Sequence, residues 1–482
     1  MHKGERWKKK LGRVWGFWDK ERVMSEWTTS KLSDVIEIIG GGTPKRSETS
    51  YWNGNIPWLS VGDFNNDFRF VSNTSEKISK LGLQNSSTKL LKAGQLILSA
   101  RGTVGCLAQL SIPMAFNQSC YGLNGKENII DNGFLYYFLK NNINELKQKT
   151  HGSVFDTITR NTFEQINISY PNIKTQQVIA RTLGFFDNKI TLNTQTNQTL
   201  EQIAQATFKH WFIDFAPVHA KANALARGET IEQAELAAMA CLSGKTAEKI
   251  TALQTQDPTA YHQLQQTAAA FPSEFVETEM GQVPRGWERT TLTHICEMKN
   301  GYAFKSKEWT DEGIPVIKIG SVKPMLIELD NGSFVAAENE TLRADFLASE
   351  GDILVGLTGY VGEVGRIPYQ EKAMINQRVA KFMPKKITET MNYYCFIYCL
   401  ARQKEFKAFT EMNAKGSAQA NISTKEILSY PVIIATKEIH IAFENTVKNL
   451  LDKIIVNSGE NSTLAKTRDE LLPRLLSGEI EL

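Results

Sequence analysis

Two short glycine patterns in the sequence resemble sites that do chemistry, and neither has the spacing that its chemistry needs. Gly244-Lys245-Thr246 resembles the end of a phosphate-binding loop, but the first glycine of that loop is missing and no strand leads into it. Gly359, Gly362 and Gly365 have the glycine count of a dinucleotide loop with the wrong spacing, which favours a tight turn or bulge. No HExxH or GxSxG motif occurs, and the seven histidines are scattered. The sequence therefore predicts neither a catalytic centre nor a metal site.

The length and composition predict a multidomain globular protein. The 482 residues are enough for about three domains, and 41% hydrophobic residues are too many for a wholly disordered chain. No apolar run approaches the roughly 20 residues that cross a bilayer, so we expect a cytoplasmic protein without a membrane partner. The six cysteines include no CxxC pair, and we expect them to be reduced structural thiols.

The positive charge of the chain is concentrated at its start. Residues 1–23 hold eight Lys or Arg and three acidic residues, so the other 459 residues sum to −2 within a total of +3. Domains that hold nucleic acid through bulk charge are usually strongly basic, so any DNA contact has to depend on local patches. We interpret residues 1–25 as a basic N-terminal extension. Its tryptophans leave open an arm that contacts nucleic acid or a membrane, but we favour a disordered extension upstream of a second possible start at Met24.

The elements that would position such patches occur twice, at an offset of about 260 residues. Each copy contains short β-type runs separated by Gly, Pro and polar loops, which is typical of an α+β domain. The matching segments are 32–41 with 292–301, 56–62 with 314–320, 94–105 with 351–362, and 117–118 with 376–377. The sequence therefore predicts one α+β domain that occurs twice.

A long helix follows each copy. An apolar repeat of 3.5 residues runs from Ile179 to Trp211 and recurs, at a constant offset of 264, from Phe443 to Leu475. Either helix alone would expose its apolar seam, so we expect the two helices to pack together.

Two asparagines interrupt each seam at its centre, Asn193 and Asn197 in the first helix and Asn457 and Asn461 in the second. In an antiparallel pair Asn193 meets Asn461 and Asn197 meets Asn457, so each buried amide finds another amide rather than Leu or Ile. We therefore predict antiparallel helices whose register these four side chains set. The alternative is that the asparagines face solvent on a loosely amphipathic helix.

Residues 219–286 differ from both repeats. They are rich in Ala and Gln and are broken by Gly228, Gly244, Pro258 and Pro272, which predicts short helices near 230–242, 245–255 and 258–269 and then an extended link. The predicted division of the chain is an extension (1–25), a first domain (26–173), a first long helix (174–218), a connector (219–286), a second domain (287–435) and a second long helix (436–482).

Two variable α+β domains, each followed by a long helix, resemble the specificity (S) subunit of type I restriction–modification systems. The resemblance runs from Glu26 to Leu482. The segments that carry it are Trp27-x-x-x-x-Leu32 and Gly286-Trp287-x-x-x-x-Leu292 at the domain starts, 94–105 and 351–362 within the domains, 271–281, and the ends of the two seams. Each segment is a weak motif alone, and their duplicated order is the strong signal.

The resemblance implies a fold, a function and partners. The fold is α+β, with two target recognition domains in a pseudo-twofold repeat joined by two long antiparallel helices that form a coiled coil. The function is a non-catalytic subunit that recognises a bipartite target in double-stranded DNA and docks two modification (methyltransferase) subunits and also restriction subunits. SAM, ATP and Mg are expected on those partners and no cofactor on this chain. The net charges of the two domains, +2 and 0, suit partners that supply much of the phosphate contact.

Within this resemblance, the candidate DNA-reading residues are polar or basic side chains in loops flanked by glycine. Arg can bind guanine with two hydrogen bonds, and Gln can bind adenine in the same way. The candidates are Lys45, Arg46, Arg69, Arg101, Gln118 and Arg160 in the first domain, and Lys305, Lys318, Lys323, Tyr360, Gln377, Arg378, Lys415 and Gln419 in the second. Any one of them could instead be a solvated charge or a structural amide. Gln118 and Gln377 are equivalent in the repeat, which favours a shared structural role, whereas Arg101 aligns with Thr358 and is the better candidate for specificity.

Two other classes of protein stay open at this point. A self-contained methyltransferase needs an Asn/Asp-Pro-Pro-aromatic motif, and the chain has no Pro-Pro pair. A coiled-coil adaptor without DNA specificity leaves two large variable domains unexplained. Methyl transfer by the chain alone would indicate the enzyme, and failure to bind DNA with partners present would indicate the adaptor.

Overall fold

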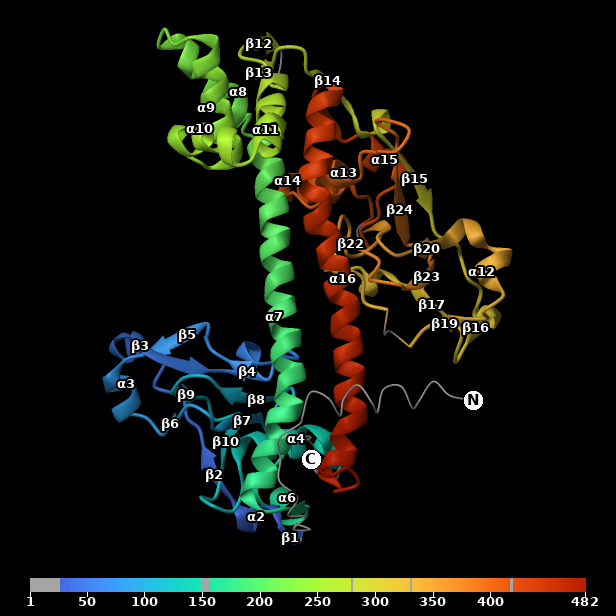
Figure 1. Cartoon of the computed structure of the whole chain (residues 1–482). Coiled ribbons are helices and arrows are strands. Elements are labelled where there is room, and N and C mark those ends of the chain that lie inside the picture. The colour runs from blue at the N-terminus through green and yellow to red at the C-terminus, as the bar shows by residue number, and fades with distance from the viewer. Residues whose placement is uncertain (1–26, 149–156, 279–280, 330–331, 417–418) are drawn as a thin grey trace. The chain divides into compact units, whose positions relative to one another are not determined.

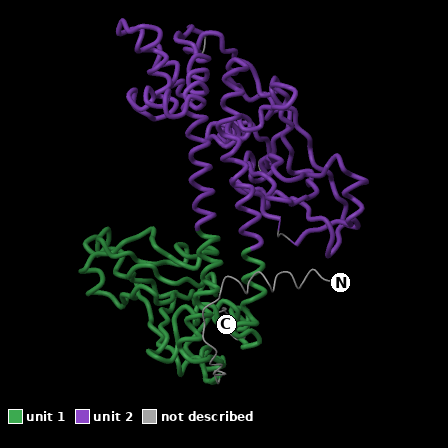
Figure 2. Tube along the Cα trace, viewed as in Figure 1, with its two compact units in different colours: residues 1–191, 464–482 green, residues 192–463 purple. Residues whose placement is uncertain are grey.

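The computed structural model describes residues 27–148, 157–278, 281–329, 332–416 and 419–482, so the predicted extension 1–25 lies outside the described residues. The chain forms two compact units (Figure 2). Unit 1 contains the residues up to 191 together with 464–482, and unit 2 contains residues 192–463. All six cysteines lie in the described part and are free thiols. Every helix in the described ranges is too short or too polar to span a lipid bilayer.

Unit 1 contains the first α+β domain (Figure 1). Its strands are β1 (Thr28–Lys31), β2 (Ile36–Gly40), β3 (Trp52–Leu59), β4 (Phe70–Val71), β5 (Glu76–Ile78), β6 (Leu90–Leu91), β7 (Leu96–Ser99), β8 (Leu107–Leu110), β9 (Met114–Phe116), β10 (Cys120–Gly125) and β11 (Asn167–Tyr170). Its short helices are α2 (Leu32–Val35), α3 (Lys80–Gln84), α4 (Asn132–Asn141), α5 (Ile143–Gln148) and α6 (Arg160–Glu164). The strands form sheets with the orders β2-β10-β7-β8-β4 and β5-β3-β9-β6, and β1 pairs with β11.

Strand β7 shows why the apolar runs of this domain become central strands. Successive side chains of a strand point to opposite faces, so a strand that is covered on both faces is apolar throughout. Leu96 and Leu98 pack into the cluster that contains α4, whereas Ile97 packs into a second cluster with Leu59 and Phe116 of the other sheet.

Unit 2 contains the second copy of the domain, with the same strand order in its main sheet. Its strands are β14 (Glu288–Thr291), β15 (Cys296–Asn300), β16 (Trp309–Thr310), β17 (Ile314–Ile317), β18 (Met325–Leu326), β19 (Phe334–Val335), β20 (Leu347–Ser349), β21 (Ile353–Gly356), β22 (Val364–Arg366), β23 (Lys372–Ile375), β24 (Val379–Pro384) and β25 (Pro431–Ile434). Its helices are α12 (Asn339–Leu342), α13 (Tyr394–Ala401), α14 (Lys404–Asn413) and α15 (Thr424–Leu428). The sheet orders are β15-β24-β21-β22-β18 and β16-β19-β17-β23-β20, and β14 pairs with β25 as β1 pairs with β11. The predicted duplication of an α+β domain is confirmed.

The two long helices are α7 (Ile173–Phe212) and α16 (Lys437–Leu476), each of 40 residues. Their starts differ by 264 positions, as the apolar repeats do. Each helix contributes to the core of both units: Ile179 of α7 and Leu475 of α16 lie in a cluster of unit 1, and Phe208 of α7 and Phe443 of α16 lie in a cluster of unit 2.

The four seam asparagines pair as predicted, and all four belong to unit 2. The amide of Asn193 donates to Asn461 Oδ1 at 2.9 Å, and the amide of Asn457 donates to Asn197 Oδ1 at 2.8 Å. Because the lower number in one helix meets the higher number in the other, the helices are antiparallel. Two of these side chains have a further acceptor: Asn193 also donates to Glu460, and Asn197 donates to the backbone carbonyl of Ile454.

The connector contains one more helix and more strand than predicted. Its helices are α8 (Ala216–Ala226), α9 (Ile231–Ser243), α10 (Ala247–Gln256) and α11 (Pro258–Ala270), and β12 (Phe275–Thr278) pairs with β13 (Gly281–Pro284) in the segment predicted as an extended link. Helix α8 was not predicted, because the first long helix was expected to run to residue 218; Pro217 lies in the first turn of α8, where its missing N–H costs nothing. Gly244, with φ of 64°, ends α9, so the phosphate-loop-like pattern is a turn between helices.

A buried arginine ties the first domain to α7, and it is one of the predicted DNA readers. Arg69 is 9% exposed, and its guanidinium donates to Gln109 Oε1 at 2.8 and 3.0 Å and to the Tyr137 hydroxyl at 3.2 Å. Tyr137 in turn donates to Asp187 of α7 at 2.6 Å, and Arg468 of α16 pairs with the same carboxylate. A guanidinium that is already desolvated and bonded on two sides cannot reach a base, so the interpretation of Arg69 as a reader is corrected here.

We predict that one seam asparagine cannot be removed alone. Asn197→Leu leaves the buried amide of Asn457 without its acceptor, and this should lower the free energy of unfolding by about 1–3 kcal/mol. The double variant Asn197→Leu/Asn457→Leu should recover most of that loss, because no amide is then left unpaired. Urea denaturation of the full chain measures both effects, with Gln198→Leu on the exposed side of the same helix as the control. Additive losses in the double variant would contradict the pairing.

A second prediction separates Arg69 from the exposed arginines. Arg69→Met should lower the free energy of unfolding by about 2–3 kcal/mol, since hydrogen bonds to a buried charged group are lost and their acceptors stay buried. Arg101→Ala should leave stability within about 0.5 kcal/mol, because Arg101 is exposed. Urea denaturation of the full chain with each substitution measures the two losses of stability. Equal losses would contradict the structural role of Arg69.

Candidate nucleic-acid interface

One edge of the main sheet of unit 1 gathers most of the readers predicted in the first domain. Strand β10 is antiparallel to both β2 and β7, with Tyr121 opposite Gly40 and Cys120 opposite Ser99. The ends of β2 and β7 and the start of β10 therefore lie at the same edge. The loops that leave this edge carry four exposed candidates, Lys45, Arg46, Arg101 and Gln118.

The equivalent edge of unit 2 has the same construction. Strand β24 is antiparallel to β15 and β21, with Asn300 opposite Ala380 and Gly356 opposite Val379. The loops at this edge carry Lys305, Tyr360, Gln377 and Arg378, all of them exposed. The repeat thus builds one scaffold twice and places different side chains on it.

Backbone hydrogen bonds hold the loops of unit 1 together. The N–H of Arg101 donates to the carbonyl of Ser119 at 3.2 Å, and the N–H of Ile158 donates to the carbonyl of Ala100 at 3.0 Å. The second bond brings the segment that precedes α6, and with it the exposed Arg160 at the start of that helix, to the same edge. The side chain of Gln118 accepts from the Thr43 hydroxyl, which agrees with the structural role predicted for this amide.

A third loop joins the edge in unit 2. Thr358 Oγ1 donates to Asn421 Oδ1 at 2.6 Å, and the N–H of Gly359 donates to the carbonyl of Ala420 at 2.9 Å. These bonds bring two exposed candidates of the segment around residues 415–421, Lys415 and Gln419, next to the turn that carries Tyr360. Asn421, which forms β-bridges with both Thr358 and Lys415, was not among the residues predicted from the sequence.

Lys318 and Lys323 lie on the second sheet and its continuation. Lys318 directly follows β17, whose last carbonyl accepts from the N–H of Asn376, and its ammonium lies 4.6 Å from the ring centre of Trp309. Lys323 precedes β18 and lies 3.9 Å from Glu328. Both side chains are exposed.

Two of the exposed cations are hydrogen-bonded to carboxylates. Arg46 stacks over Trp52 at 3.9 Å and forms a two-pronged pair with Glu76, and this hydrogen bonding lowers the pKa of Glu76. Lys415 donates to Glu426 at 2.6 Å; this bond, followed by bonds from Ser423, lowers the pKa of Glu426 to about 2. Both terminal nitrogens of the Arg46 guanidinium donate to Glu76, so Arg46 must release Glu76 before it can bind guanine with two hydrogen bonds. These acidic partners were missed because nothing in the local sequence marks them.

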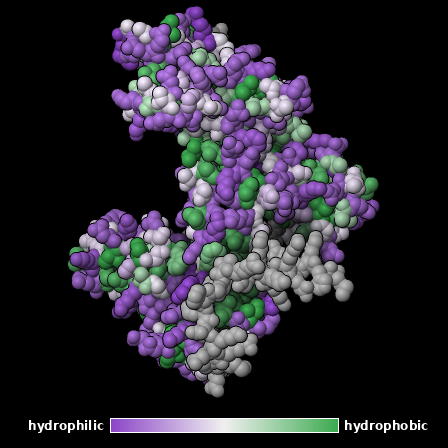
Figure 3. All heavy atoms as spheres, viewed as in Figure 1, coloured by the Kyte–Doolittle hydropathy of each residue, from purple (hydrophilic) through white to green (hydrophobic). Residues whose placement is uncertain are grey.

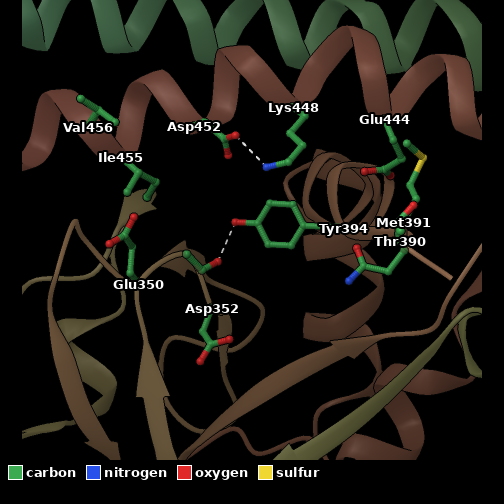
Figure 4. A pocket seen from close by; sticks show the side chains of 12 residues that line it. Glu350, Asp352, Thr390, Met391, Tyr394, Glu444, Lys448, Asp452, Ile455 and Val456 are labelled. Carbon is green, nitrogen blue, oxygen red and sulfur yellow. Dashed lines mark hydrogen bonds and ion pairs between the residues drawn. The ribbon is translucent and has the colours of Figure 1, made fainter.

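A cavity of about 730 Å³ in unit 2 lies apart from this edge, between α16 and the turn that joins β20 and β21 (Figure 4). Its charged lining is mainly acidic: Glu350, Asp352, Glu444 and Asp452, with Lys448. Lys448 pairs with Asp452 at 2.7 Å and Lys381 pairs with Asp352 at 2.6 Å. An acidic lining repels phosphate, so we exclude this cavity from the nucleic-acid interface. In the described ranges no three His, Cys, Asp or Glu side chains are grouped as metal ligands.

The surface that remains is polar and divided into small patches. On the face shown in Figure 3, most residues of each unit are hydrophilic, and the hydrophobic residues form small areas among them. This agrees with local contact patches rather than one broad basic surface.

Comparisons with known proteins agree with this architecture. The model of the type I restriction modification DNA specificity domain matches residues 24–202 and again 284–462. The HindI specificity subunit of Haemophilus influenzae is 32% identical over 479 residues, which cover 95% of this chain and 100% of that protein. The MjaIX specificity subunit of Methanocaldococcus jannaschii is 26% identical over 477 residues, 96% of each chain.

A solved structure supports the same fold. The S subunit of a type I restriction-modification system from M. genitalium has a TM-score of 0.51 and 19% identity, and the match covers 95% of this chain and 98% of that one. The resemblance seen in the sequence is confirmed. With two matched copies that span most of its length, the chain belongs to the type I restriction-modification DNA specificity family.

Proposed function

We propose that this chain is the DNA-recognition subunit of a type I restriction–modification complex, in which each domain reads one half of a bipartite target. The observation that carries the proposal is the duplicated sheet edge: the same strand ends present different side chains in the two units. Arg101 in unit 1 is replaced by Thr358 in unit 2, and Thr103 is replaced by Tyr360. Two readers that share a scaffold and differ in their loops suit a target whose halves differ.

The readers that the structure favours are those that are exposed and free to reach a groove. Arg101 is the first of them, because only its backbone is engaged at the edge and its side chain can form two hydrogen bonds with guanine. At the equivalent edge of unit 2 the exposed arginine is Arg378, whose carbonyl accepts from the N–H of Leu357. With nearly neutral domains, partner subunits would supply much of the phosphate contact.

We further propose that the chain itself is not catalytic. Its relatives are named specificity subunits, and methyl transfer, DNA translocation and cleavage would belong to modification and restriction subunits that carry SAM, ATP and Mg. Since the substrate would be the DNA of the cell, the complex would work in the cytoplasm.

The exposed side of α7 offers a surface for the modification subunits. Val178 and Phe185, both in unit 1, lie seven residues apart on α7 and are 39% and 65% exposed. A heptad stripe on the outside of a helix is the pattern that another helix packs against. Within unit 2, Leu192 of α7 and Val456 of α16 occupy equivalent positions of the repeat and are 57% and 46% exposed, so two identical partners could dock on related surfaces.

The recognition proposal predicts a loss at one half-site only. Arg101→Ala in the complex with its methyltransferase subunits should weaken binding to the methylated target by about 1–3 kcal/mol and relax the base preference at one position of one half-site. Sequencing of methylated bases in a host that carries each variant measures this. Arg227→Ala, an exposed arginine of the connector, is the control. Equal weakening on every DNA sequence would make Arg101 a phosphate contact instead.

The docking proposal predicts loss of partner without loss of fold. Phe185→Glu should reduce co-purification of the modification subunit at least tenfold, because a charge would be buried against the partner helix. The melting temperature of the free chain should stay unchanged, since Phe185 is exposed. Ile231→Glu, at an equally exposed apolar residue of α9, is the matched control. Normal assembly with Phe185→Glu would remove this face of α7 from the interface.

A further inference from the structure

The turn between β21 and β22 exposes an aromatic ring. Tyr360 is 67% exposed, and among the described residues of unit 2 it is the only Phe, Tyr or Trp that the fold leaves largely uncovered. The other rings of the unit are at least half covered, many of them in the cluster around Phe212 and Phe396. An exposed ring at the edge proposed to meet DNA therefore calls for a specific role.

The backbone that carries this ring is firmly held. The N–H groups of Gly359, Gly362 and Glu363 donate to the carbonyls of Ala420, Gly356 and Tyr360 at 2.9, 3.0 and 3.3 Å. Val361, the next residue, is 3% exposed and anchors the turn in the core.

Gly362 lets this turn lie against α14. Its φ is 74°, and a Cβ there would lie 2.0 Å from Thr410 Oγ1, so only glycine permits this approach. The turn is thus a rigid support whose outermost side chain is the ring of Tyr360.

The segments beside the turn carry groups that can hydrogen-bond to DNA. Arg378 is tied to Leu357 just before the turn, and Gln419 lies beside Gly359, where its amide nitrogen is 3.6 Å from the position of a Cβ. An aromatic side chain that projects among such polar groups is placed to enter the base stack while they contact base edges and phosphates.

The first unit has the same turn without the ring. Gly102 and Gly105 have φ values of 77° and 91°, and the N–H of Gly105 donates to the carbonyl of Ser99 at 3.0 Å. Thr103 and Val104 take the places of Tyr360 and Val361. The support is shared and the ring is not, so whatever the ring does concerns only the half-site of unit 2.

We propose that Tyr360 inserts its ring between two adjacent base pairs of the half-site that unit 2 reads, and that it opens that step as a wedge. The proposal rests on the DNA-recognition function proposed above. Stacking of an aromatic ring on a base offsets the cost of unstacking the pair, and a kinked step brings the flanking groove closer to the polar loops. Flexible pyrimidine–purine steps are the cheapest to open, so the wedge selects sequence by deformability as well as by contact.

The test uses the full chain in complex with its methyltransferase subunits and a duplex that carries the target mapped from the host genome. 2-Aminopurine, whose fluorescence rises when it leaves the stack, is placed at each position in turn, and the complex is added at saturating concentration. The wild-type complex should raise the fluorescence at one step of one half-site. Tyr360→Ala should abolish that rise and weaken binding about tenfold, whereas Tyr360→Phe should keep both. Ile231→Ala, at an exposed apolar residue of the connector, should change neither.

The methylated adenines give an internal reference. A methyltransferase takes its target base out of the stack, so a probe at those positions should respond in both half-sites, and Tyr360→Ala should leave that response intact at saturation. An unchanged signal at the candidate step in Tyr360→Ala would overturn the wedge. Equal losses in Tyr360→Phe and Tyr360→Ala would overturn it in favour of a hydrogen bond from the hydroxyl. If the wild-type complex bound no duplex and gave no adenine signal, the recognition function itself would fail.

Discussion

The pairing of buried amides between α7 and α16 is the constraint on which the other features depend. An amide in an apolar seam has to find a partner, and Asn193, Asn197, Asn457 and Asn461 find one another in one antiparallel register only. That register decides which part of each helix enters which core. Because Ile179 and Leu475 share a cluster in unit 1, the first domain cannot complete its core until the last helix of the chain is made. The helix pair is therefore a component of both domains rather than a linker between them.

Duplication then turns one scaffold into two readers. In both units the main sheet has the same order, and the strand ends that meet at one edge are fixed by ladder hydrogen bonds. Backbone hydrogen bonds and glycine turns hold the loops at that edge, so their exposed side chains can vary without loss of the fold. The same sheet can therefore present two different recognition surfaces, because the side chains of the loops differ while the strands stay the same.

Features with a local period or an exact repeat could be predicted from the sequence, and features that depend on distant pairs could not. The heptad seam and its asparagines are visible in the sequence itself, and they gave the helix pair and its direction correctly. The exposure of Arg101 and the burial of Arg69 are not visible in it, because both are arginines near glycine or aromatic residues. The carboxylates that hold Arg46 and Lys415 are Glu76 of β5 and Glu426 of α15, which approach these two loops only in the folded chain. Helix α8 was missed because the first long helix was expected to continue to residue 218, whereas α7 ends at Phe212 and a new helix begins at Ala216.

The anchoring of each domain shows which features the fold has to preserve. In unit 1 the buried guanidinium comes from Arg69, beside β4, and in unit 2 it comes from Arg366 of β22, which is the counterpart of β8. Both lie over a tyrosine of the domain helix, Tyr137 or Tyr398, and both tyrosines donate to a carboxylate of α7. Two copies of one domain thus satisfy the same requirement from different strands. Because different residues make this arginine–tyrosine–carboxylate contact in the two units, we infer that its role is structural: it fixes the sheet to α7. A DNA-reading side chain on a loosely held sheet could not keep the geometry that two hydrogen bonds to one base require. Firm anchoring of the sheet therefore allows the side chains of the loops to differ between the two units.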